Sequence, residues 1–397
     1  MDARTNPFAP GAGSMPPALE GRDQVITDVS VALHRIRNGL AAKSVLMVGL
    51  RGVGKTVLLN RLKNDAESEG IVCAQFESPE DRNLPAMLIP SLRAALLRLD
   101  HIAGFTHSVG GAVSKAVKTL GSFIGSAKLK FGDLEFGFDL GKELGAADTG
   151  DFDYDLTDLL VAVGLAAKEK QTAVVLFIDE LQYVPAEQLA SLISALHACA
   201  QKNLPVALVG AGLPQLIGNV GKAKSYAERL FSFPEIGPLK ESASIEALQG
   251  PVQKHQISFS PEALQIILNQ TQGYPYFLQE WASHCWAVAL VSPISQDDAK
   301  LASKLALTQL DSSFFRVRFD RCTPMEKNYL RAMAEIATPA PRSGDIAAAL
   351  NKEVNQLGPL RQSLIKKGMI YSPAHGDTAF TVPLFGAYMK RTMHMPS

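Results

Sequence analysis

Residues 49–56 read Gly49-Leu50-Arg51-Gly52-Val53-Gly54-Lys55-Thr56 and match the pattern G-x-x-x-x-G-K-[ST] in full. The glycines let the backbone wrap closely, so that successive N–H groups point at the phosphates of a nucleotide. We expect Lys55 to reach the β- and γ-phosphate oxygens and Thr56 to offer its hydroxyl to Mg²⁺. An apolar stretch, residues 44–48, precedes the loop, and a helix that includes Val57 should begin at Lys55. Strand, loop and helix together predict a site for ATP.

A second motif, Ala173-Val174-Val175-Leu176-Phe177-Ile178-Asp179-Glu180, is an apolar run that ends in two carboxylates. Such a run fits a central buried strand, and ligands of open α/β sheets bind beyond the carboxyl ends of the strands. Asp179 should order the Mg²⁺ shell, and Glu180 should polarise the attacking water. Taken alone, the pair fits a solvated strand end equally well. The complete loop at residues 49–56 favours the catalytic interpretation.

The composition is that of a folded, soluble protein. Of the 397 residues, 47% are hydrophobic and 20% are charged, which excludes a disordered or low-complexity chain. Lysine plus arginine and aspartate plus glutamate both total 39, so no global field attracts the chain to nucleic acid or membrane. Residues 311–397, the C-terminal module below, carry 12 basic and seven acidic residues. A basic module therefore follows a mildly acidic body.

The cysteines and apolar runs bear on compartment. Four well-separated cysteines without a CxxC pair argue against a zinc site or a disulfide framework and fit a reducing cytoplasm. No apolar run approaches the ~18 residues of a membrane helix. The first residues contain Pro and Gly where a signal peptide needs an apolar core. We expect a cytoplasmic protein without a membrane partner.

Short apolar segments alternate with helical ones from residue 23 onward. The expected strands are residues 44–48, 71–77, 173–178 and 206–209, and the expected helices are 57–66, 85–99 and 186–199. Short, fully apolar strands separated by helices predict an α/β fold with a parallel sheet covered on both faces. Residues 1–18, rich in Pro, Gly and Ala, should be an extended flexible tail that buries little.

Residues 101–155 interrupt this alternation, and we interpret them as an insertion. Five apolar residues share one face of a helix: Val109, Val113, Val117, Leu120 and Ile124. Residues 129–138 then alternate around Gly132-Asp133, which predicts a hairpin, and an acidic stretch follows at residues 148–158. The helix should pack on its own hairpin, with a partner or membrane surface as the alternative.

The last 160 residues are expected to be largely helical. Residues 238–310 read as helices with breaks at Gly250-Pro251 and Gly273-Tyr274-Pro275. In the C-terminal module, Thr323-Pro324-Met325-Glu326 is a helix start, and Ser343 can cap a short second helix. A third helix should run from about residue 354 or 359 to Lys367. Residues 369–372 and 379–382 should form a two-stranded wing, which completes a winged-helix pattern.

These motifs resemble a family. Leu19-Glu20-Gly21-Arg22-Asp23 resembles the GR[DE] box of origin-recognition-like AAA+ ATPases and of the related STAND signalling ATPases. The box lies by the adenine in those families, which implies nucleotide contacts for Gly21, Arg22 and Asp23. The segment 273–278 resembles the G-x-P segment of their helical lid and implies that Pro275 packs against the base.

The resemblance covers roughly residues 18–295 and is strongest to bacterial origin-recognition-like AAA ATPases. It implies a P-loop ATPase core at residues 19–237, an all-α lid at 238–310 and a winged helix at 311–397, after the tail at 1–18. Two departures limit it. The strand at 206–209 leads into Gly210-Ala211-Gly212 without a polar sensor residue, and no arginine stands beside Pro275. A slow or partner-stimulated ATPase switch is therefore expected.

Arg229 precedes the expected last strand, residues 231–236. In AAA+ assemblies an arginine there reaches the γ-phosphate of the neighbouring subunit, which implies a catalytic role in trans within an ATP-dependent homo-oligomer. A surface arginine paired with Glu228 or another acid is an equal alternative.

The third helix of the winged pattern would be a recognition helix for double-stranded DNA. Its polar and basic residues are Asn355, Gln356, Arg361, Gln362, Lys366 and Lys367. The last four are our candidate DNA contacts. The alternative is a STAND-like signalling or defence ATPase whose winged helix closes over ATP and contacts protein. A metabolic P-loop kinase fits less well, because the GR[DE] box, lid and wing have no place in it.

Overall fold

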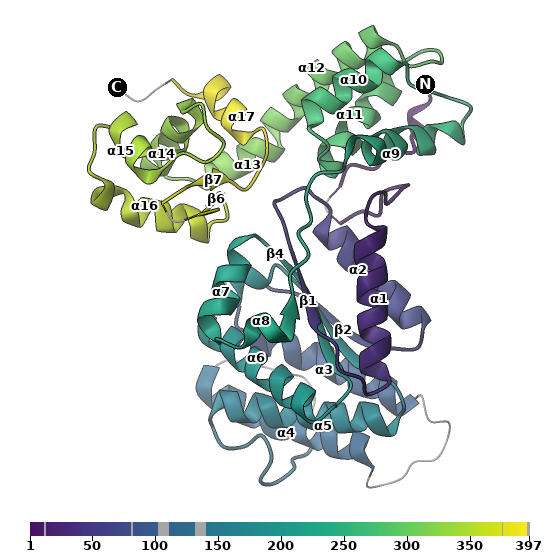
Figure 1. Cartoon of the computed structure of the whole chain (residues 1–397), viewed down its shortest axis with the longest axis vertical. Helices are drawn as coiled ribbons and strands as arrows, with labels where there is room; N and C mark the ends of the chain where they lie inside the picture. Colours follow the sequence, from purple (N-terminus) through teal and green to yellow (C-terminus); the bar gives the residue numbers. More distant parts are fainter. Residues whose placement is uncertain (12, 81, 102–110, 132–139, 375, 395–397) are drawn as a thin grey trace.

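The structure is a computed structural model of the chain. It describes all residues except 12, 81, 102–110, 132–139, 375 and 395–397. Figure 1 shows three parts: a sheet domain in the lower half, a helical region above it at the end where the N-terminus lies, and the C-terminal module beside that region. Among the described helices, none is long and apolar enough to span a membrane.

The sheet has five strands, all parallel, in the order β2-β3-β4-β1-β5. Their bounds are β1 Ser44–Val48, β2 Val72–Glu77, β3 Val174–Asp179, β4 Val206–Gly212 and β5 Phe231–Ser232. The predicted parallel sheet is confirmed. Only the last strand is much shorter than expected, with one further bridge between Val48 and Glu235.

Both faces of the sheet are buried, which explains why its strands are continuously apolar. Met47, Val175 and Phe177 point to one face and pack on helices α1 and α2, whereas Leu46, Leu176 and Ile178 point to the other. The helices of this domain are α1 Asp23–Arg37, α2 Lys55–Ser68, α3 Leu84–His101, α4 Ala112–Phe131, α5 Phe152–Glu169, α6 Ala186–Gln201, α7 Gln215–Ala223 and α8 Ala227–Leu230.

The segment predicted as an insertion is part of the core. Helix α4 packs against α3 and α5 on the second face of the sheet, with Leu120 and Phe123 fully buried. The hairpin prediction is wrong at residues 129–131, which continue α4, while its remainder and Val109 fall outside the described residues. The acidic stretch is the start of α5, whose first turn is capped by the Asp151 carboxylate. The sequence pattern indicated only an acidic stretch here and did not predict the helix.

The helical region comprises α9 Glu241–Gln253, α10 Pro261–Thr271, α11 Pro275–Val288 and α12 Gln296–Ser312. The break predicted at Gly273-Tyr274-Pro275 is present, and Pro275 takes the first position of α11, where its missing N–H costs nothing. The break at Gly250-Pro251 is absent. Helix α9 continues through Pro251 and ends two residues later.

The C-terminal module consists of α13 Phe314–Asp320, α14 Pro324–Glu335, α15 Ser343–Ala349, α16 Val354–Lys366, β6 Ile370–Tyr371, β7 Ala379–Phe380 and α17 Phe385–Thr392. Thr323 and Glu326 form the capping box expected at the start of α14. The strands β6 and β7 pair antiparallel after α16, as expected for the wing. Arg342, not Ser343, is the cap of α15.

The N-terminal tail is docked, contrary to the prediction that it buries little. Phe8 is 4% exposed within the core cluster that also contains Trp286. Trp286 Nε1 donates to the carbonyl of Asp2 at 2.8 Å, and Asn6 Nδ2 donates to Ser283 Oγ at 3.0 Å. The Phe8 side chain and several hydrogen bonds, among them also Ala9 N to Gln279 Oε1 at 3.3 Å, therefore hold the tail along α11, despite its composition.

Candidate nucleotide site

The loop 49–54 begins where the buried strand β1 ends. Gly49 N donates to Gly212 O of β4 at 3.2 Å, and a side chain at Gly49 would lie 2.1 Å from Ile236 O. Position 49 therefore accepts only glycine, because any Cβ would overlap this carbonyl oxygen. Gly52 and Gly54 have φ of 83° and 90°, a left-handed conformation that glycine adopts without strain. The sequence thus fixes the loop shape at three glycines, and α2 starts directly at Lys55.

The ammonium of Lys55 is buried in this loop. Its Nζ donates to Gly49 O and Leu50 O, both at 2.9 Å. Burial lowers the pKa of Lys55 to about 8, against the pull of Glu180 and Asp179. A cation held by carbonyls alone is a ready partner for phosphate oxygens.

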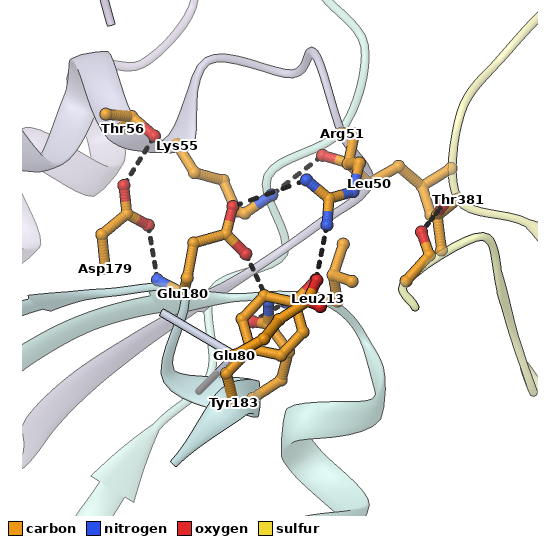
Figure 2. A network of polar contacts seen from close by, with 12 residues as sticks. Leu50, Arg51, Lys55, Thr56, Glu80, Asp179, Glu180, Tyr183, Leu213 and Thr381 are labelled. Carbon is orange, nitrogen blue, oxygen red and sulfur yellow. Dashed lines mark hydrogen bonds and ion pairs between the residues drawn. The ribbon is translucent and has the colours of Figure 1, made fainter. Parts of the chain in front are cut away.

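The two carboxylates predicted at the end of β3 take different environments. Thr56 Oγ1 donates to Asp179 Oδ2 at 2.6 Å, while Asp179 Oδ1 accepts from Glu180 N at 2.8 Å. Burial raises the pKa of Asp179, and the Thr56 hydrogen bond opposes it. Glu180 has φ of 52°, which turns it out of the strand, and it accepts a hydrogen bond from Gln182 Nε2. Figure 2 shows these groups converging at the mouth of the loop.

Arg51 connects the loop to three parts of the chain. Its Nη1 lies 3.8 Å from Glu180 Oε1, and its Nη2 donates to the Tyr183 hydroxyl at 2.7 Å. Its main-chain N–H donates to Thr381 O of the C-terminal module at 3.0 Å (Figure 2). A side chain at Gly368 would lie 2.8 Å from Arg51 Nη2 and 2.9 Å from the Tyr183 oxygen, so the module also packs directly here.

A cavity of about 360 Å³ opens over this loop. Four segments wall it: the N-terminal residues around Pro10 and Ser14, the loop with Lys55 and Thr56, the helical region, and α13. Among the predicted nucleotide contacts, the cavity lining contains Arg22, Arg51, Gly52, Val53, Gly54, Lys55, Thr56, Val57 and Pro275. The tail thus forms part of the site, which its composition did not reveal.

The predicted GR[DE] box is divided by the structure. Arg22 lines the cavity, and its Nη2 donates to Val53 O at 3.1 Å and Gly237 O at 2.5 Å. Burial lowers the pKa of Arg22. Asp23 is exposed at the first position of α1, where a carboxylate stabilises the helix dipole. Gly21, at φ 67°, makes the turn before it.

The chain resembles known proteins in sequence and in fold. Residues 18–209 match a family model described as "AAA ATPase domain", and residues 312–389 match one described as "Domain of unknown function (DUF8462)". The Walker-type ATPase paby2304 of Pyrococcus abyssi shares the fold with a TM-score of 0.58 at 15% identity, over 94% of this chain and 96% of that one.

Residues 18–209 are thus similar in sequence to AAA ATPase domains. The chain is accordingly an ATP-hydrolysing P-loop enzyme with an α/β fold, as predicted. Two further structures are more distant. The Holliday junction branch migration motor RuvB of Thermotoga maritima has a TM-score of 0.44 at 15% identity, over 97% of this chain and 100% of that one. The ORC1 protein of Aeropyrum pernix, solved in complex with DNA, has a TM-score of 0.46 at 12% identity, over 95% and 94%. No curated protein matches the sequence.

Two polar residues of the AAA ATPase domain were missed by sequence reasoning. The end of β4 has no polar side chain of its own, as noted, but Gln182 lies there, and its Oε1 accepts from Leu213 N at 2.9 Å. Through Nε2 the same amide also holds Glu180. Tyr183 bonds Arg51 and Glu80. Their only signal was their place directly after the acidic pair.

Arg229 and the four candidate DNA contacts on and after α16 do not line the nucleotide cavity. Arg229 is exposed on the four-residue helix α8, and no ion pair involves it in the described part of the chain. On α16, Arg361 bonds Thr378, Ser372 and the Asp377 carbonyl. Lys367 Nζ contacts Glu326 Oε2 at 2.7 Å. Gln362 and Lys366 are exposed.

Proposed function

We propose that this AAA ATPase is an ATP-dependent switch whose C-terminal module is held on the phosphate-binding loop and responds to the nucleotide. The observation that carries the proposal is the hydrogen bond from Arg51 N to Thr381 O, together with the packing of Gly368 on Arg51 and Tyr183. A loop that wraps phosphates adjusts its backbone to them, so a partner bonded to that backbone experiences the adjustment.

The roles within the site follow from its geometry. Lys55 binds the β- and γ-phosphates, and the loop amides bind the remaining phosphate oxygens. Thr56 and Asp179, already 2.6 Å apart, fit the hydroxyl and carboxylate ligands of Mg²⁺, which would neutralise phosphate charge. Glu180 orients the attacking water.

Slow turnover is part of the proposal. Glu180 is engaged by Gln182 and faces Arg51 at 3.8 Å, so its carboxylate must leave these partners before it can polarise water. A change in the module that moves Arg51 would free it. Hydrolysis is then expected to be stimulated when a partner displaces the module.

A second bridge supports the same arrangement. Arg321, between α13 and α14, donates from Nη2 to both carboxylate oxygens of Glu80 at 2.9 Å, and this hydrogen bond raises its pKa. Glu80 in turn bonds Tyr183, the partner of Arg51. The chain from Arg51 to Arg321 thus joins the nucleotide site to the module through side chains alone.

The STAND-like alternative is therefore preferred over DNA binding. The module keeps the three helices and hairpin of the winged-helix interpretation, but Arg361 and Lys367 serve internal contacts. Of the four candidate DNA contacts, Gln362 and Lys366 are exposed and make no side-chain hydrogen bond or ion pair with the residues that the structure describes.

We retain the division into a core at residues 19–237, a lid at 238–310 and the module at 311–397, and assign the tail 1–18 to the nucleotide site.

A pair of glycine variants tests the switch. Gly368 and Gly376 both have positive φ, at 62° and 84°, so replacement by Ala strains both by about 1–2 kcal/mol. Only Gly368→Ala places a methyl against Arg51 and Tyr183, because a methyl added at Gly376 would have no described atom beyond its chain neighbours within 4 Å. We expect Gly368→Ala to speed release of fluorescent ADP and to raise ATP turnover. If both variants release ADP at the same rate, the module does not control the site.

A further inference from the structure

Helix α13 lies between the nucleotide cavity and the rest of the C-terminal module. Phe314 and Arg318, one turn apart, line the cavity. Phe315 and Phe319 contact α17, with ring centroids 5.3 and 5.9 Å from that of Tyr388. One short helix therefore lines the nucleotide cavity and contacts the module at the same time.

Arg318 is a cation without an anion. Its guanidinium stacks over the Phe314 ring at 3.9 Å, and Nη1 donates to Phe314 O at 2.7 Å. Throughout the described residues it forms no ion pair. Burial lowers its pKa to about 10, so the group remains charged at neutral pH. Arg318 is half-buried, and a cation that is partly removed from water with a neutral carbonyl as its hydrogen-bond partner gains when a ligand supplies the negative charge.

The position of Arg318 indicates which part of the ligand supplies this negative charge. The Phe314 ring under the guanidinium stacks on Tyr276, with ring centroids 4.9 Å apart, and Tyr276 N donates to Gly52 O of the phosphate-binding loop at 3.2 Å. These contacts connect Arg318 to the phosphate end of the cavity, which it lines together with Arg51 and Glu180. Pro275, at the start of α11, also lines this cavity, and the base is assigned there by resemblance. A planar guanidinium suits phosphate oxygens, which it can bind through two parallel hydrogen bonds.

We propose that Arg318 binds the terminal phosphate of ATP in cis and that α13 transmits this contact to the C-terminal module. The inference rests on the proposed function and specifies its regulation. ADP lacks the phosphate that Arg318 reaches, so the two nucleotides differ in their hold on α13. Because Phe315 is fully buried and its ring lies 5.9 Å from that of Phe385, a movement of α13 must carry α17 or break that packing.

Arg318→Gln in the full chain tests the phosphate contact, and Arg316→Gln is its matched control. Arg316 lies on the same helix, its side chain is 68% exposed, and its one ion pair among the described residues is with Asp320 at 3.5 Å. By calorimetry, Arg318→Gln should weaken binding of the slowly hydrolysed analogue ATPγS about ten- to a hundredfold, as for loss of a charged hydrogen bond. ADP binding should change less than about threefold. Arg318→Lys, which keeps the charge, should recover part of the loss.

Equal weakening for ATPγS and ADP, or none for either, would overturn the inference. Hydrogen exchange of α14–α17 provides the second readout. In wild type and in Arg316→Gln, the exchange rates of α14–α17 should differ between the ATPγS and ADP complexes. In Arg318→Gln, the rates in the two complexes should be the same. If wild type distinguishes the nucleotides in affinity but not in exchange, the switch fails while the phosphate contact stands. If wild type binds neither nucleotide, both proposals fall.

Discussion

Arg51 N, in the phosphate-binding loop, donates to the carbonyl of Thr381 at 3.0 Å, although 330 positions separate the two residues. The backbone N–H groups of such a loop ordinarily donate to nucleotide phosphates. In this protein the Arg51 N–H donates to the C-terminal module instead, so the loop contacts both the module and the nucleotide site. The predictions below depend on that double use.

Lys55→Ala should abolish nucleotide binding, because the buried ammonium is the main positive charge at the phosphates. Glu180→Gln should retain ATP and lose hydrolysis, since an amide cannot polarise water as a carboxylate does. Filter binding and phosphate release measure the two effects. Equal turnover by wild type and Glu180→Gln would remove Glu180 from the catalytic role.

ATP affinity should depend on pH through Lys55. Its pKa is lowered from 10.5 to about 8, so the free site loses its proton above pH 8 and bound phosphate restores it. Affinity should therefore fall by up to about tenfold per pH unit above 8. The folding stability of the nucleotide-free protein should instead increase with pH over this range. Between pH 8 and 10.5 the unfolded chain holds the proton that the folded one has released, so folding stability rises there. Titrations and melting curves from pH 7 to 10 would show both trends, and a flat affinity profile would contradict the first.

The sequence predicted the centre of the molecule better than its periphery. Strand β1 and the helix start at Lys55 were placed to the residue, because buried strands and glycine loops carry strong local signals. Helix α5 was not predicted, and residues 129–131 were assigned to a hairpin because alternation over a few residues fits a helix end as well. Such signals do not encode tertiary partners.

The same limit applies to the site. The loop, Asp179 and Glu180 were found by pattern, whereas Gln182, Tyr183 and Arg318 were not. Their place depends on how the lid, β4 and α13 assemble around the loop, and single residues without spacing carry no motif. The docked tail was missed for a similar reason, because a single phenylalanine anchors a Pro/Gly-rich segment.

Phe8→Ala should destabilise the protein by about 3 kcal/mol, the usual loss for a buried phenylalanine. It should also weaken nucleotide binding, because Pro10 and Ser14 line the cavity only while the tail is docked. Denaturant unfolding and calorimetry measure the two effects, with exposed Thr5→Ala as the control. Unchanged affinity in a destabilised Phe8→Ala protein would show that the tail is structural only.

Arg229 remains a predicted trans-acting residue, and its exposed position on α8 leaves it accessible to a neighbouring subunit. If it completes a neighbour's site, mixing Arg229→Ala with Glu180→Gln should restore part of the ATPase activity. If the mixture is no more active than either variant alone, and the protein stays monomeric in ATP, Arg229 has no catalytic role in a neighbouring subunit.

DNA binding is tested at Lys366, the exposed basic residue of α16. A phosphate contact there would contribute about 0.9 to the slope of log affinity against log salt. We expect Lys366→Ala to leave that slope unchanged for a random duplex, since Arg361 and Lys367 are engaged within the module. Fluorescence anisotropy at several salt concentrations would measure it, and a reduced slope would restore the DNA-binding alternative.

One hydrophobic cluster runs from Val175 in the sheet through Trp281 of α11 to Phe385 of α17. The three parts of the chain therefore share one hydrophobic core, so none of them can be replaced independently of the others. Removing the last 80 residues would leave the apolar partners of α17 in water, so the ATPase domain owes some of its own cohesion to the element that it regulates. Unfolding should then be cooperative across the whole molecule, and natural variation on either side of the junction should be matched on the other.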